Sequence, residues 1–71
     1  MMPLSLLQAG QEAVVCKVGG NPELKAHLAD LGFVSQARIS VIQSHDGDLI
    51  INLKESRLAL TREMASKIMV V

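Results

Sequence analysis

The chain has 71 residues, of which 49% are apolar and one is aromatic, and its seven basic and seven acidic residues give a formal net charge of zero. Binding to a phosphate backbone requires clustered Lys and Arg, and single-strand binding requires aromatic stacking platforms, so this composition argues against a nucleic acid as partner. The length is sufficient for one domain, residues 1–71, with one small aliphatic core.

Cys16 is the only cysteine, so no intrachain disulfide and no cysteine-based zinc cluster can form. One unpaired cysteine is consistent with a reducing compartment. The first residues lack the basic region and the apolar run of a signal peptide, and no stretch approaches the roughly 20 apolar residues of a membrane span. We therefore expect a cytoplasmic protein that does not insert into a membrane.

Residues 4–9 are expected to form one helical turn. Ser5 and Gln8 match a capping box, in which the serine side chain accepts from the backbone N–H of the glutamine and the glutamine side chain accepts from the backbone N–H of the serine. This turn would place Leu4 and Leu7 under the fold.

Residues 13–18 predict the first strand, because apolar side chains alternate along it. Val14, Cys16 and Val18 would share one face. Cys16 is expected to be buried there as a small hydrophobic side chain, because free cysteine is among the most buried residue types and no ligand partner lies nearby in the sequence.

Residues 22–31 carry a complete set of helix signals. Asn21 can cap the first turn, Pro22 suits the first helical position, and Gly32 supplies the left-handed residue that commonly ends a helix. Leucines at spacings of four and three form one apolar stripe, which consists of Leu24, Leu28 and Leu31. The helix is therefore expected to cover an apolar surface along one side.

The second half of the chain is expected to contain four strands, each a short and largely apolar run, at residues 37–44, 49–54, 57–60 and 67–71. The Asp46-Gly47 pair predicts a hairpin between the first two of them, and residues 61–65 predict a helical turn. About five short strands in so short a chain cannot form two packed sheets. We expect a mostly β fold, a small curled barrel with the helix at about 22–31 closing one open end.

The candidate metal ligands are few and scattered. His27 and His45 are 18 residues apart, and Asp46 and Asp48 flank a turn glycine. A built metal site needs three or four converging ligands. We therefore expect no dedicated metal site and no cofactor, and a weak divalent-metal contact by His27, His45, Asp46 or Asp48 stays open as an alternative.

No Ser/His/Asp set, paired carboxylates or activated lysine is present, so we expect no enzyme and look to the surface instead. The candidate contact residues are Leu31, Phe33, Val34, Met64 and Met69. Phe33 has two interpretations, because it could dock a partner or plug the barrel end. The apolar last strand is expected at an edge, where it could pair with a partner or form a homodimer.

Several segments, in order along the whole chain, resemble the FeoA family. They are the L-x-x-L-x-x-G of residues 4–10, the helix end Leu28-x-x-Leu31-Gly32, the Asp-Gly hairpin, Leu58-Ala59-Leu60 and Ala65-x-x-Ile68-x-Val70. The structural signature is thus Gly10, Gly32, Leu58, Leu60, Ala65 and Ile68. The resemblance implies a small cytoplasmic SH3-like barrel that assists bacterial ferrous iron uptake by acting on the cytoplasmic G-protein region of the FeoB permease.

Two turns depart from the family pattern. Many relatives have Pro-Gly shortly after the Leu-Gly, where this chain has Val34-Ser35-Gln36, and the usual glycine near Lys54-Glu55-Ser56 is missing. The resemblance also extends to the C-terminal domain of DtxR-type metal-dependent repressors. The alternatives are therefore a metal-responsive regulatory module and a weak transition-metal binder.

Overall fold

The computed structural model describes residues 1–71, which form six strands, two α-helices and one 3-10 turn. In chain order these are β1 (Met2–Pro3), η1 (Leu4–Leu6), β2 (Glu12–Val18), α1 (Pro22–Leu31), β3 (Arg38–His45), β4 (Asp48–Leu53), β5 (Ser56–Leu60), α2 (Arg62–Ala65) and β6 (Ile68–Val70). The strands pair antiparallel in the order β1-β6-β2-β3-β4-β5. The mostly β fold with one principal helix is confirmed.

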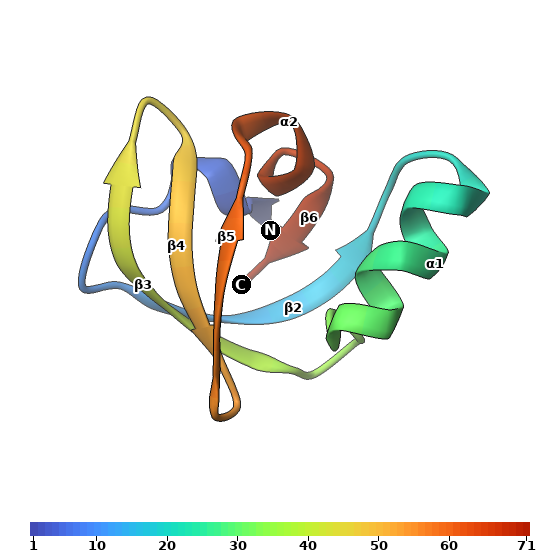
Figure 1. Cartoon of the computed structure of the whole chain (residues 1–71), viewed down its shortest axis with the longest axis horizontal. Coiled ribbons are helices and arrows are strands. Elements are labelled where there is room, and N and C mark those ends of the chain that lie inside the picture. Colours follow the sequence, from blue (N-terminus) through green and yellow to red (C-terminus); the bar gives the residue numbers. More distant parts are fainter.

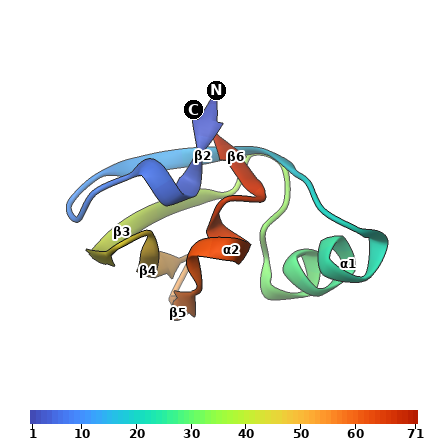
Figure 2. The same cartoon turned by 90° about the horizontal axis from the view of Figure 1, so that it is seen from above.

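The sheet curls around one apolar core (Figures 1 and 2). β2 is shared by both halves of the sheet, because it pairs with β6 on one side and with β3 on the other. Every buried residue is apolar, and the largest fully buried side chain is Phe33. On β4 the buried residues alternate, at Leu49, Ile51 and Leu53, as a strand with one face on the core requires. The alternation expected for residues 49–54 is therefore confirmed, whereas that of residues 37–44 holds only as far as Val41, because a β-bulge follows between Val41 and Gln43.

A β-bulge in β2 changes which side chains face the core. Val15 pairs with Val70 and Lys17 pairs with Met69, so Cys16 is an extra residue without a partner on β6. An extra residue moves every later side chain to the other face. Val18 therefore packs against the core, and Cys16 is only half-buried. The expectation that Cys16 is buried on one face with Val14 and Val18 was wrong, because Ala13 and Val15 are the residues that face the core and the bulge then turns Val18 away from the face of Cys16.

The N-terminal turn is shorter than expected and has no side-chain cap. The capping box of Ser5 and Gln8 does not form. Instead, the backbone N–H of Gln8 donates to Oε1 of Gln11 at 2.6 Å. Leu4 and Leu7 are nevertheless buried, as predicted.

Helix α1 has the caps that its sequence predicts. Oδ1 of Asn21 accepts from the backbone N–H of Leu24 at 2.8 Å, and Gly32 ends the helix with φ of 108°. Of the leucine stripe, Leu28 is fully buried, whereas Leu24 and Leu31 pack against the core from its edge. Figures 1 and 2 place α1 at one end of the long axis, between the end of β2 and the start of β3.

The last strand is not an edge strand. β6 lies between β2 and β1, and β1 is a two-residue strand, Met2–Pro3, that sequence patterning did not predict. A strand of two residues is too short to show any alternation. The free edges of the sheet belong to β1 and β5, so the argument for a homodimer through the last strand is wrong.

Candidate functional site

The connection between α1 and β3 buries the only aromatic side chain. The backbone N–H of Phe33 donates to the carbonyl of Leu28 at 3.0 Å, which turns the chain back toward the barrel. The Phe33 side chain is 1% exposed. The plug interpretation of Phe33 is therefore confirmed, and Phe33 offers no area to a partner.

Val34 follows immediately and is 48% exposed. Its backbone is held in a tight turn, since the N–H of Val34 donates to the carbonyl of Gly32 at 2.9 Å and its carbonyl accepts from the backbone N–H of Ala37 at 3.0 Å. Beside this turn, Leu31 is half-buried at the last position of α1. We call Leu31 and Val34 the α1–β3 surface. It is an apolar surface on a backbone fixed by hydrogen bonds.

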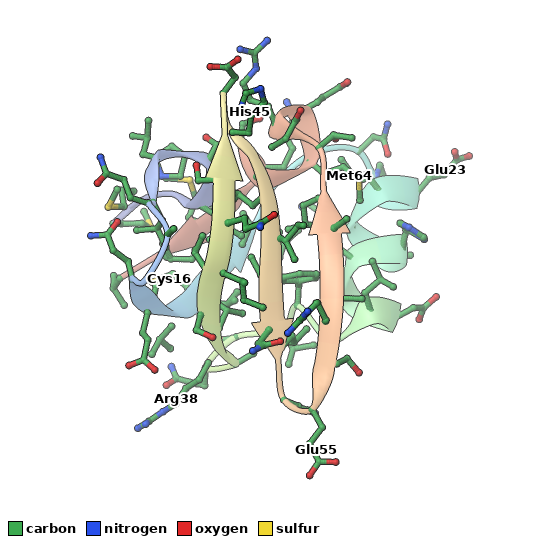
Figure 3. The ribbon with its side chains drawn as sticks, turned by 60° about the vertical axis from the view of Figure 1, so that its left-hand side comes forward. Cys16, Glu23, Arg38, His45, Glu55 and Met64 are labelled. Atoms are coloured by element: carbon green, nitrogen blue, oxygen red, sulfur yellow. The ribbon has the colours of Figure 1, made fainter.

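The two methionine candidates lie on other elements. Met64 is half-buried on α2, where it packs against the core (Figure 3), and Met69 is half-buried on β6. Neither belongs to the α1–β3 connection. Their burial leaves them less contact area than Val34 has.

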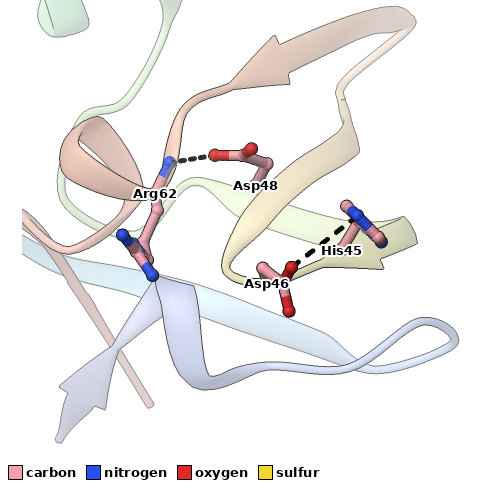
Figure 4. Close-up of polar contacts among 4 residues, drawn as sticks. All are labelled: His45, Asp46, Asp48 and Arg62. Atoms are coloured by element: carbon pink, nitrogen blue, oxygen red, sulfur yellow. Dashed lines mark hydrogen bonds and ion pairs between the residues drawn. The ribbon is translucent and has the colours of Figure 1, made fainter.

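The candidate metal ligands do not converge. His27 is exposed on α1, whereas His45 ends β3. His45 Nε2 lies 3.7 Å from Asp46 Oδ2, with the two side chains 90% and 85% exposed. Asp48 turns the other way and accepts a hydrogen bond from the backbone N–H of Arg62 at 2.6 Å (Figure 4). No three His, Cys, Asp or Glu side chains gather where they could hold a metal ion, so the residues present do not fit a resident metal.

The signature residues shape the backbone and the core. Gly10 has φ of 91°, and its N–H donates to the carbonyl of Val41 at 2.8 Å. A Cβ on Gly32 would lie 2.9 Å from Cδ2 of the buried Leu53. The apolar members of the signature lie in or against the core, and these are Leu58, Leu60, Ala65 and Ile68. The signature is therefore structural.

Two grooves lie on the outer face of the sheet, and sequence reasoning singled out neither. One, of about 520 Å³, has a mixed lining, in which Arg38, Asn52 and Lys54 occur together with apolar residues such as Val14 and Val71. The other, of about 340 Å³, is lined by residues that include Ile50 and Ala59. The alternation of β3 and β4 predicts which side chains point outward. It does not predict which outward side chains lie next to each other on neighbouring strands, and so it does not reveal the grooves.

No helix in the structure has the length and apolar character needed to cross a lipid bilayer.

Known proteins resemble this chain along its whole length. The model of the FeoA domain matches residues 2–71. A relative from Methanocaldococcus jannaschii, named Fe(2+) transport protein A, is 33% identical over 70 residues, which cover 99% of this chain and 85% of that protein.

Solved structures agree in fold. An iron uptake regulatory protein (FeoA) has a TM-score of 0.90 at 30% identity, covering 97% of this chain and 93% of its own. FeoA of Stenotrophomonas maltophilia, an SH3 domain protein solved with zinc, has a TM-score of 0.85 at 27% identity. The match covers 100% of this chain and 91% of that chain. A manganese-dependent transcriptional repressor shares the fold alone, with a TM-score of 0.89 at 19% identity, over 97% of this chain and 40% of its own.

Because the FeoA model matches residues 2–71 and a relative named Fe(2+) transport protein A is 33% identical over 99% of the chain, this chain belongs to the FeoA family of SH3-like proteins associated with ferrous iron transport.

Proposed function

We propose that this protein is a non-enzymatic cytoplasmic accessory factor of ferrous iron uptake that acts by direct contact with the cytoplasmic G-protein region of a FeoB-type permease. The observation that carries the proposal is the FeoA match over residues 2–71. It is supported by the lack of any metal-holding cluster, which leaves the surface as the functional part of the molecule. Members of the family are transport accessories rather than known enzymes.

The α1–β3 surface is the contact that we propose. Val34 is exposed, apolar and held on a rigid turn, so little conformational entropy is lost when a partner covers it. Leu31 extends the apolar area at its side. Exposed apolar residues of this kind form the anchors of protein interfaces when a partner provides a matching pocket.

The test is a binding measurement with the full-length permease in detergent, with and without guanine nucleotide. Val34→Asp places a charge in the proposed interface and should weaken binding about tenfold or more. Leu6→Asp is the matched control, because Leu6 is 63% exposed and lies on η1, away from the α1–β3 connection. Wild-type affinity of Val34→Asp would remove the α1–β3 surface from the proposal, and no binding by the wild-type chain would remove the permease contact itself.

A weak divalent-metal contact is the second candidate. It is favoured by the 3.7 Å approach of His45 to Asp46 and by the zinc that accompanies the S. maltophilia relative. Two exposed side chains make an open and weak site, since stable zinc sites take three or four protein ligands. The alternative function as a metal-responsive regulatory module is supported only by the fold that this chain shares with the manganese-dependent repressor. Such a module would need a partner that supplies DNA-binding helices.

A further inference from the structure

The outer face of β3, β4 and β5 is uncovered in Figure 3, where Arg38 lies toward its lower end. Arg38, Asn52 and Lys54 line the larger groove, where Glu12 is the one acidic side chain and the last residue, Val71, also belongs to the lining. Arg57 pairs with Asn52 across β4 and β5, so its side chain projects on the same face. Glu55, at the tip of the β4–β5 hairpin, points away from the sheet in Figure 3. Three cations therefore gather on one face of a protein whose net charge is zero.

None of these three cations has an internal partner. The one ion pair in the structure joins His45 and Asp46, at the far end of β3. No hydrogen bond involves the side chain of Arg38, Lys54 or Arg57. Unneutralised charges of one sign on one face attract a partner of the opposite sign and set its orientation.

Lys54 occupies its position at a conformational cost. Its φ is 58°, in the left-handed region, where an L-residue is strained and glycine is not. Residues held in sparsely populated backbone regions concentrate at functional sites. The two-residue turn between β4 and β5 sets this φ, and glycine rather than a cation would adopt it without strain.

The upper half of the same face carries the smaller groove, which exposes mainly apolar surface although His45 and Asp48 are among its lining residues. Ile50 pairs with Gln43 on one side and with Ala59 on the other, and all three line the smaller groove. Ile50 is half-buried although it points outward. It lies two residues from Asn52 on β4, which places the apolar groove about 7 Å along the strand from the basic one.

We propose that this outer face binds an extended acidic segment of a partner protein. Carboxylates of the segment lie against Arg38, Lys54 and Arg57, and one apolar side chain occupies the groove formed by Ile50 and Ala59. The cations select for acidic residues, and the neighbouring apolar groove selects for a peptide over a bare phosphate, which has no aliphatic group. A second copy of this chain fits poorly, because its own face carries the same three cations. The proposal does not depend on the α1–β3 surface or on the permease.

The test titrates the full chain, labelled with 15N, with three synthetic peptides. The first has four glutamates followed by alternating threonine and leucine. The second replaces the glutamates with lysines, and the third replaces the leucines with serines. We expect saturable amide shifts at Ser40, Asn52, Ile50 and Ala59 with the first peptide, none with the second, and about three- to tenfold weaker binding with the third.

Lys54→Gly separates binding from stability. It removes a cation and also relieves the strained backbone, so we expect binding to weaken about threefold while Tm stays equal or rises. Adding Arg38→Gln should bring the loss to about tenfold. Lys25→Gln is the matched control, because Lys25 is an exposed cation on α1, and its binding should equal that of the wild type.

Three results would overturn the proposal. The first is that the lysine and glutamate peptides bind equally well, and the second is that the double variant binds the acidic peptide as tightly as the wild type. The third is that these four amides shift with protein concentration in the absence of peptide, which would assign the face to a second copy of the chain. Val34→Asp should bind the acidic peptide normally. A failure of the permease contact and a failure of this face are thereby distinguished.

Discussion

Asp48 joins the β3–β4 hairpin to helix α2, because its Oδ1 accepts a 2.6 Å hydrogen bond from the backbone N–H of Arg62, 14 residues further on. The first N–H groups of a helix have no partner within the helix, and a carboxylate there is favoured by hydrogen bonding and by the helix dipole. The hairpin approaches closely, since a Cβ on Gly47 would lie 2.5 Å from Cγ of Arg62. Asp48, which the sequence suggests as a candidate metal ligand, therefore links the β3–β4 hairpin to α2.

Removing this carboxylate should destabilise the fold. Asp48→Ala leaves the Arg62 N–H without its acceptor, and we expect a loss of about 1 kcal/mol in the free energy of unfolding. For a domain of this size that corresponds to a fall in Tm of about 4–8 °C in a thermal melt. Asp46→Asn is the control, because Asp46 makes no hydrogen bond and asparagine tolerates its φ of 51°. An equal fall in both variants would contradict the role of Asp48.

The departure from the family pattern after the helix should carry a stability cost. Gln36 has φ of 76°, in the left-handed region. Gln36→Gly should raise the free energy of unfolding by about 0.5–1 kcal/mol, because relief of strain exceeds the entropy that glycine adds to the unfolded chain. Ser35→Gly, one residue earlier and without a positive φ, should lower it by about 0.4–1 kcal/mol. Urea melts of the two variants would show shifts of opposite sign, and shifts of the same sign would refute this account.

The two signature glycines should differ in their sensitivity to alanine. Gly10 and Gly32 both have positive φ, so each alanine should cost about 1–2 kcal/mol in backbone strain. A Cβ on Gly10 would meet nothing within 4 Å, whereas a Cβ on Gly32 would press on the buried Leu53. Gly32→Ala should therefore be the more destabilising by about a further 1 kcal/mol or more, as judged by denaturant midpoints. Equal midpoints for the two variants would show that the core around Leu53 rearranges to accept the extra methyl group with no loss of stability.

Divalent metal should bind weakly and at separate places. Titration with Zn²⁺ or Fe²⁺, followed by NMR of the imidazole signals, should move His45 only at high metal concentration, because its one neighbour is Asp46 at 3.7 Å. His27 lies on another element and should respond independently. Saturable binding of either histidine in the micromolar range would instead support a metal carrier. Asp46→Asn is the control, since it should weaken only the response of His45.

The sequence by itself determined the local elements. The caps of Asn21 and Gly32, the alternation of β4 and of β3 as far as Val41, and the Asp-Gly turn each depend on residues close together in the sequence, and the structure has each of them. Local hydrogen bonding and side-chain periodicity decide such features without any distant contact. The ordered set of these segments was also sufficient to indicate the FeoA family.

Only the tertiary structure decided what depends on pairing between distant residues. At Cys16 the pairing of β6 with β2 shifts by one residue, and this bulge turns Val18 toward the core, against which it packs while partly buried. The same arrangement places β6 inside the sheet, turns Phe33 into the core and leaves Val34 outside. The grouping of Arg38, Lys54 and Arg57 likewise results from three strands in register. Register is a property of two strands at once, so no single run of residues could reveal it.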